Sequence, residues 1–190
     1  MTSPLWLNDS LAYLLSPISK EEFLQNYFEQ KSLLCVHNDP NRFADLVSIE
    51  RIDDLIADSE LPPRSIQMAR HKPTIYRDDF TFSNGNIDRG SVIGASQEGA
   101  IIILPQMHLA DGVLMDFSKA LENTFSCHIQ TNNYLTPPKN LGFPSHYDNH
   151  YVFVTQVSGK KRWKIYEDPL ENPYRGEEFK RNKHQVGDSI

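Results

Sequence analysis

Cysteine is scarce in this sequence, since the 190 residues contain only two, Cys35 and Cys127, which lie far apart in the chain. Their spacing excludes the closely spaced cysteine pairs that bind structural zinc, and two cysteines are too few for a disulfide framework. We therefore expect reduced thiols and a cytoplasmic location.

Long hydrophobic runs and a basic excess are also missing. No stretch approaches the roughly 18 consecutive apolar residues of a membrane span, and the N-terminus lacks the pattern of a secretory signal. These absences predict a soluble protein with no membrane partner. The formal net charge of -6 offers no clustered excess of lysine and arginine for binding phosphates. We expect no direct nucleic-acid binding, and a basic protein or peptide fits better as a partner.

The composition is that of an ordinary globular protein, with 39% hydrophobic and 23% charged residues. Ser19 and Glu22 have the spacing of a capping box, which predicts a helix that begins there. Ser48 is a suitable N-cap for a second helix, and helical spacing of apolar residues predicts a third at 111–123. Short apolar or alternating runs predict strands, at residues 32–36, 65–70 and 100–104.

The pattern changes to strands in the last third, where we predict them at residues 127–134, 151–157 and 162–166. Helices followed by short strands predict an α+β protein whose C-terminal part is a sandwich or barrel. We divide the chain into a mostly helical part, residues 1–95, and a β-rich part, residues 96–190.

His146 and Asp148 are the first candidates for chemistry. On an extended strand residues i and i+2 point to the same side, so this imidazole and carboxylate can reach one metal ion. Two histidines and one carboxylate form the iron(II) site of many oxygenases. The same spacing joins Asp148 to His150, so that pair is an open alternative.

The surrounding sequence carries a family resemblance. Residues 132–148 are NNYLTPPKNLGFPSHYD and residues 152–163 are VFVTQVSGKKRW. This stretch resembles the JmjC oxygenases of the ribosomal-oxygenase group, whose pattern is N-x-Y-x-T-P-P, then G-F-x-x-H-x-D, then F-x-x-Q-x-x-G-x-K-x-W. The dense match covers about residues 127–166. The resemblance implies that the C-terminal part is a double-stranded β-helix, the jelly roll of the cupins.

The resemblance also implies a set of site residues. His146 and Asp148 match two of the family's iron(II) ligands, and Lys161 matches the lysine that binds the distal carboxylate of the co-substrate 2-oxoglutarate. Asn132 and Tyr134 match polar residues that hydrogen-bond the same molecule. The residues alone leave another interpretation open for Lys161, because a basic triplet is usually solvated. Alternation places Lys161 on one side with Trp163, and its two basic neighbours on the other.

The family's third ligand is a histidine that follows a P-G-D segment on a later strand. The sequence reaches Gly187 and Asp188 without such a histidine. We therefore expect a jelly roll that is incomplete at the C-terminus, in a fragment of a longer oxygenase. His184 is an alternative third ligand, although its basic neighbours favour an exposed position.

These observations predict an iron- and 2-oxoglutarate-dependent protein hydroxylase that acts on an arginine or histidine of a ribosomal protein. The family also favours a homodimer. Three alternatives remain: a catalytically silent cupin used for binding or dimerisation, a JmjC lysine demethylase, and a small-molecule oxygenase. Fold alone does not choose between them.

Overall fold

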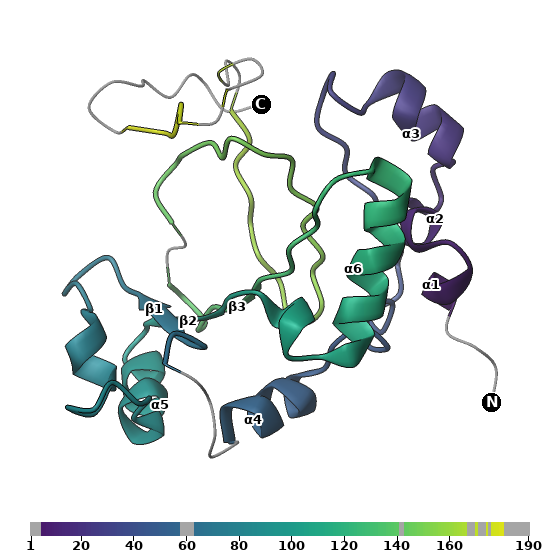
Figure 1. Ribbon diagram of the computed structural model, residues 1–190. Helices are drawn as coiled ribbons and strands as arrows, with labels where there is room; N and C mark the ends of the chain where they lie inside the picture. The colour runs from purple at the N-terminus through teal and green to yellow at the C-terminus, as the bar shows by residue number, and fades with distance from the viewer. Residues whose placement is uncertain are drawn as a thin grey trace.

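The computed structural model describes residues 5–57, 63–140, 143–166, 170, 174 and 176–180 (Figure 1). These residues form helices and a small antiparallel sheet. The helices are α1 (Leu5–Asn8), α2 (Ser10–Leu15), α3 (Lys20–Asn26), α4 (Ile49–Ala57), α5 (Arg89–Gln97) and α6 (Gly112–Phe125), with 3-10 turns η1 (Arg77–Phe80) and η2 (Met107–Leu109). The strands are β1 (Gln67–Ala69), β2 (Ile101–Leu104) and β3 (Asn133–Leu135). No helix in these ranges is both long and apolar enough to span a bilayer.

Side-chain caps start the helices where the sequence predicts them. The Ser19 hydroxyl accepts a hydrogen bond from the Glu22 N–H at 3.0 Å, at the start of α3. Ser48 accepts from the Arg51 N–H at 3.2 Å in front of α4, and Asp111 caps α6. Each cap binds an N–H group that the first helical turn leaves without an intrahelical partner. The three predicted helices are therefore confirmed.

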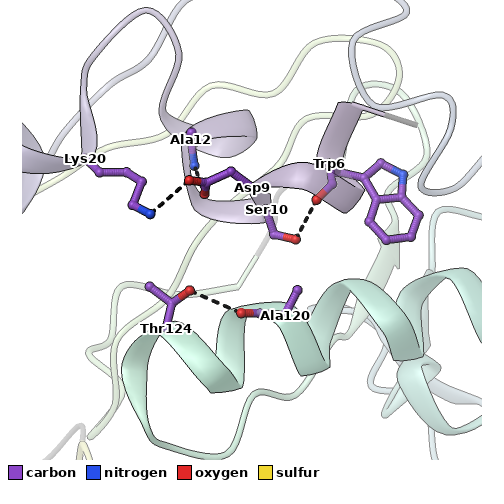
Figure 2. A network of polar contacts seen from close by, with 7 residues as sticks. All are labelled: Trp6, Asp9, Ser10, Ala12, Lys20, Ala120 and Thr124. Atoms are coloured by element: carbon purple, nitrogen blue, oxygen red, sulfur yellow. Dashed lines mark hydrogen bonds and ion pairs between the residues drawn. The ribbon is translucent and has the colours of Figure 1, made fainter. Parts of the chain in front are cut away.

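The N-terminal helices pack against α6 (Figure 1). The Trp6 ring meets Phe117 of α6 edge-on, with 5.9 Å between the ring centroids. Figure 2 shows the polar contacts around this corner. The Ser10 hydroxyl donates to the Trp6 carbonyl at 2.9 Å, and the Lys20 ammonium pairs with Asp9 at 2.9 Å. These contacts hold α1, α2 and the start of α3 together at one end of the core.

The sheet has the order β1-β2-β3, and both pairings are antiparallel. Ile102 and Leu104 belong to the main hydrophobic core. Because side chains alternate along a strand, Ile103 points to the opposite side. Tyr134 of β3 lies directly across from Ile103 in the register. One side of the sheet therefore packs on the core, and the other side carries Tyr134.

Several predicted strands do not form in the described part of the chain. Residues 32–36, 151–157 and 162–165 pair with no strand, and the strand predicted over 127–134 is reduced to β3. A strand needs a neighbour for its backbone hydrogen bonds. Side chains along 151–156 and 162–165 are instead exposed, with fractions of 57% at Tyr151, 54% at Val154 and 48% at Ile165.

The mixture of helix and small antiparallel sheet that the sequence predicts is confirmed. The jelly roll itself is not formed among the described residues, which build a three-stranded sheet. The division into residues 1–95 and 96–190 stays a prediction.

Candidate iron and 2-oxoglutarate site

Strand β3 positions the first two candidate residues. Tyr134 lies within β3 and is 50% exposed, whereas Asn132 immediately precedes it. The Asn132 side-chain oxygen accepts hydrogen bonds from the Gln106 N–H at 3.0 Å and from the Gln130 amide at 2.9 Å. Since that oxygen is engaged, the Asn132 amide nitrogen is the group that could donate to a ligand.

Lys161 lies beside Tyr134. Its ammonium nitrogen is 5.9 Å from the centroid of the Tyr134 ring and 5.0 Å from that of the Trp163 ring. This arrangement agrees with the alternation that places Lys161 and Trp163 on one side. Lys160 is exposed, while Lys161 is half-buried. A cation between two rings gains from their negative faces, and it remains able to bind an anion.

His146 and Asp148 point toward each other, with 3.9 Å between His146 Nε2 and Asp148 Oδ1. Both side chains are partly open to solvent, at 43% and 46% exposed. The Nδ1 atom of His146 lies 2.7 Å from the Pro144 carbonyl oxygen. Because a carbonyl can only accept, Nδ1 carries the proton in that bond. In the neutral imidazole Nε2 is then the nitrogen with a free lone pair, and this nitrogen faces Asp148.

Phe143 connects this pair with Tyr134. Its ring centroid is 6.0 Å from that of Tyr134 and 6.3 Å from that of His146, with near-perpendicular planes in both cases. Burial, and then the negative charge of Asp148, raise the pKa of the Tyr134 hydroxyl. Four of the five candidate residues are thus linked through short contacts, and Asn132 stands two positions from Tyr134.

The donor chemistry of His146 and Asp148 suits a divalent metal, because a neutral imidazole and a carboxylate are both good ligands. Their ligand atoms, 3.9 Å apart, are close enough that both could contact a single ion. No group of three or more histidine, cysteine, aspartate or glutamate side chains gathers at metal-binding distance within the described residues. The third predicted ligand is therefore not identified there, and His184 lies outside them.

His150, the alternative partner of Asp148, is exposed, and its Nδ1 lies 3.3 Å from the Tyr151 carbonyl. It does not line the pocket that opens beside the pair. That pocket, of about 290 Å³, is formed by His146, Tyr147, Asp148, Asn149, Glu178 and Phe179. Glu178 and Phe179 were not predicted from the sequence. No local motif marks them, because only the folding of the chain brings residues 178–179 next to 146–149.

Residues 106–188 match the family described as the JmjC domain, and the match includes all five candidate residues. Residues 106–188 are therefore similar to a JmjC domain. The predicted resemblance to JmjC oxygenases is confirmed by this match and by the relatives of the chain.

Similar proteins extend over most of the chain. A bifunctional lysine-specific demethylase and histidyl-hydroxylase NO66 from Drosophila grimshawi is 32% identical over 165 residues, which are 85% of this chain and 22% of that protein. Proteins with the same name from Drosophila mojavensis and Aedes aegypti are each 30% identical, over 84% and 83% of this chain and 18% and 25% of their own length. The chain thus spans about a fifth to a quarter of the relatives it matches.

Proposed function

We propose that the protein containing this JmjC-like region is an iron(II)- and 2-oxoglutarate-dependent protein hydroxylase. His146 and Asp148 would hold the iron, and Asn132, Tyr134 and Lys161 would bind 2-oxoglutarate. Iron and 2-oxoglutarate supply the oxidising chemistry when they are bound. The protein's own residues bind, orient and enclose the reactants.

The hydrogen bond between His146 Nδ1 and the Pro144 carbonyl is the observation that carries this proposal. Histidines that bind metals usually donate their second ring N–H to a carbonyl or carboxylate, which fixes the tautomer and the ring orientation. Here that bond leaves Nε2 with its lone pair free, and Nε2 faces Asp148. The imidazole nitrogen and the carboxylate are thus close enough to serve as two ligands of one metal ion.

The contacts of Tyr134 support a carboxylate site at Lys161. A tyrosine hydroxyl is protonated at neutral pH, and burial and the charge of Asp148 raise the pKa of Tyr134 further, so that the phenol is a hydrogen-bond donor. Together with the Lys161 ammonium nearby, it can bind one end of a dicarboxylate. Hydrogen bonds from charged donors to carboxylates are about twice as strong as neutral ones.

A protein side chain is the proposed substrate. The similar proteins are named for lysine demethylation and histidyl hydroxylation, which are both reactions at protein side chains. We propose hydroxylation of an arginine or histidine of a ribosomal protein, carried out in the cytoplasm by a protein that can form a homodimer. A double-stranded β-helix around the site, incomplete at the C-terminus of this sequence, belongs to the same proposal.

Two other functions have support. The described residues gather only two metal ligands, which favours a silent cupin that binds a partner without catalysis. The names of the relatives favour a lysine demethylase equally with a hydroxylase. Both demethylation and hydroxylation need the iron site, so a metal-binding experiment separates them from the silent module.

The test is anaerobic titration of the full chain with iron(II) and 2-oxoglutarate, while the weak visible charge-transfer absorption of their complex is followed. We expect the band in the natural protein and its loss in His146→Ala. The His150→Ala variant is a matched control that should keep the band. Absence of the band from the natural protein would contradict the proposed function and leave the silent module.

A further inference from the structure

The pocket beside His146 and Asp148 has a composition that the iron and 2-oxoglutarate site does not explain. Two of its lining residues are aromatic, Tyr147 and Phe179, and a further carboxylate comes from Glu178. None of the six lining residues is a lysine or an arginine. The pocket is therefore aromatic and acidic, and it opens directly next to the proposed metal ligands.

Contact between the two rings holds the two walls of this pocket together. The Tyr147 and Phe179 centroids are 5.4 Å apart, with planes at 87°. Edge-to-face packing of this kind is favourable beyond the apolar area it buries. Because Tyr147 directly precedes Asp148, the contact sets the segment around residue 178 against the proposed iron ligands.

The two carboxylates of the pocket, Asp148 and Glu178, have different roles. In the proposed function Asp148 is committed to the metal. Glu178 is exposed, and it forms no salt bridge with another residue of the described part of the chain. Its negative charge is available to a molecule that enters the pocket.

We propose that Glu178, with the rings of Tyr147 and Phe179, binds a cationic side chain of the protein substrate and so determines specificity. Aromatic faces attract cations, and a guanidinium can also donate to a carboxylate. An acidic side chain would be repelled by Glu178, and a purely apolar one would leave that carboxylate without a partner. The size of the pocket, about 290 Å³, is at the low end for ligand sites and suits one side chain.

This inference rests on the proposed function, because the bound side chain is the group that would be presented to the iron. The probes are a short peptide with a central arginine and the same peptide with citrulline, which has nearly the same shape and no charge. Calorimetry of the full chain with iron(II) and 2-oxoglutarate, without dioxygen, gives the affinity for each. We expect the arginine peptide to bind roughly three to ten times more tightly, as for a partly exposed ion pair.

Two variants locate the source of that preference. Glu178→Gln keeps the shape of the side chain and should abolish the preference for arginine. Glu177→Gln removes the same charge one position away, where the carboxylate accepts a hydrogen bond from the Tyr174 N–H at 2.8 Å and does not line the pocket. This control should retain the preference.

Equal affinity of the natural chain for the two peptides, or a preference that survives in Glu178→Gln, overturns the inference. The charge-transfer absorption of the same samples keeps this result apart from the proposed function. A band with no preference defeats only the role of Glu178, whereas a missing band defeats the hydroxylase proposal itself.

Discussion

Phe28 and Tyr151 lie with their ring centroids 5.3 Å apart, so the turn after α3 contacts the segment that follows Asp148. Phe28 also packs on Phe125 at the end of α6, at 5.4 Å, and Phe125 on Phe153, at 5.8 Å. Two of these rings lie at or just after the ends of helices α3 and α6, and each of them contacts one ring of the segment that follows Asp148. The helices therefore support the segment that carries Asp148, although they contribute no ligand.

Truncation of Phe28 tests this support. The Phe28→Ala variant loses the contacts with Tyr151 and Phe125, and because Phe28 is partly buried we expect a loss of about 2–3 kcal/mol in the free energy of unfolding. Urea unfolding followed by circular dichroism measures it. Leu34→Ala is the control, since Leu34 is 83% exposed and its truncation should cost less than about 0.5 kcal/mol. Equal losses in the two variants would contradict the supporting role.

Asp111 joins two helices through one carboxylate. One oxygen caps α6 by accepting from the Leu114 N–H at 2.9 Å, and the other pairs with Arg51 of α4. The Asp111 side chain is only 10% exposed. We expect Asp111→Ala to lower the free energy of unfolding by about 2–3 kcal/mol, through loss of the cap and of the ion pair.

Asn is as good an N-cap as Asp, so Asp111→Asn separates the two contributions. It keeps the cap and removes the charge, and we expect it to cost about 1 kcal/mol. Thermal or urea unfolding of the two variants supplies the comparison. If Asp111→Asn were as damaging as Asp111→Ala, the ion pair and not the cap would dominate.

The sequence predicted helices α3, α4 and α6 well, whereas it gave no individual prediction for α1, α2 and α5. Ser19, Ser48 and Asp111 act through neighbours three residues away, so their caps are local and visible in the sequence. Within α4, Ile52 and Ile56 are buried in the core, whereas Ile49 in the first turn is 47% exposed. The first turn of a helix can face solvent when nothing packs over it.

Strands were predicted less well, because strand pairing is not local. An alternating or apolar pattern marks residues 65–70, 100–104 and 151–157 alike. Only the first two segments form paired strands, β1 and β2. The site shows the same division. His146, Asp148 and Lys161 are marked by motifs, whereas Glu178 reaches the pocket through tertiary contacts that no motif records.

The burial of His108 leads us to expect that the stability of the protein depends on pH. The His108 side chain is 7% exposed, and its Nδ1 accepts a hydrogen bond from the Thr131 N–H at 3.3 Å. Burial, followed by the neighbouring His128, lowers the pKa of His108 below the usual value of 6.5. The unfolded chain then binds more protons than the folded one as the pH falls through 6.5. Stability is complete above that pH and decreases below it.

We expect His108→Asn to reduce this pH dependence, because an asparagine can still accept from Thr131 and does not titrate. His37, whose pKa is lowered by burial and by Arg42, should supply the remaining slope. Urea unfolding of both proteins at several pH values between neutral and mildly acidic gives the slopes. Identical slopes would show that His108 has the same pKa in the folded and unfolded chain.

Lys160 and Lys161 are neighbours with opposite environments, which provides a matched test of the co-substrate site. Lys161 is half-buried beside the Tyr134 and Trp163 rings, whereas Lys160 is exposed. If Lys161 binds a carboxylate of 2-oxoglutarate, Lys161→Ala removes a charged hydrogen bond worth about 1.5–3 kcal/mol. The dissociation constant for 2-oxoglutarate should then rise roughly ten- to a hundredfold.

Anaerobic titration in the presence of iron(II) measures this dissociation constant. The control variant Lys160→Ala should leave the constant within about twofold, as expected for a solvated surface charge. Similar losses in the two variants would mean that general positive charge attracts the co-substrate and that Lys161 has no specific contact with it.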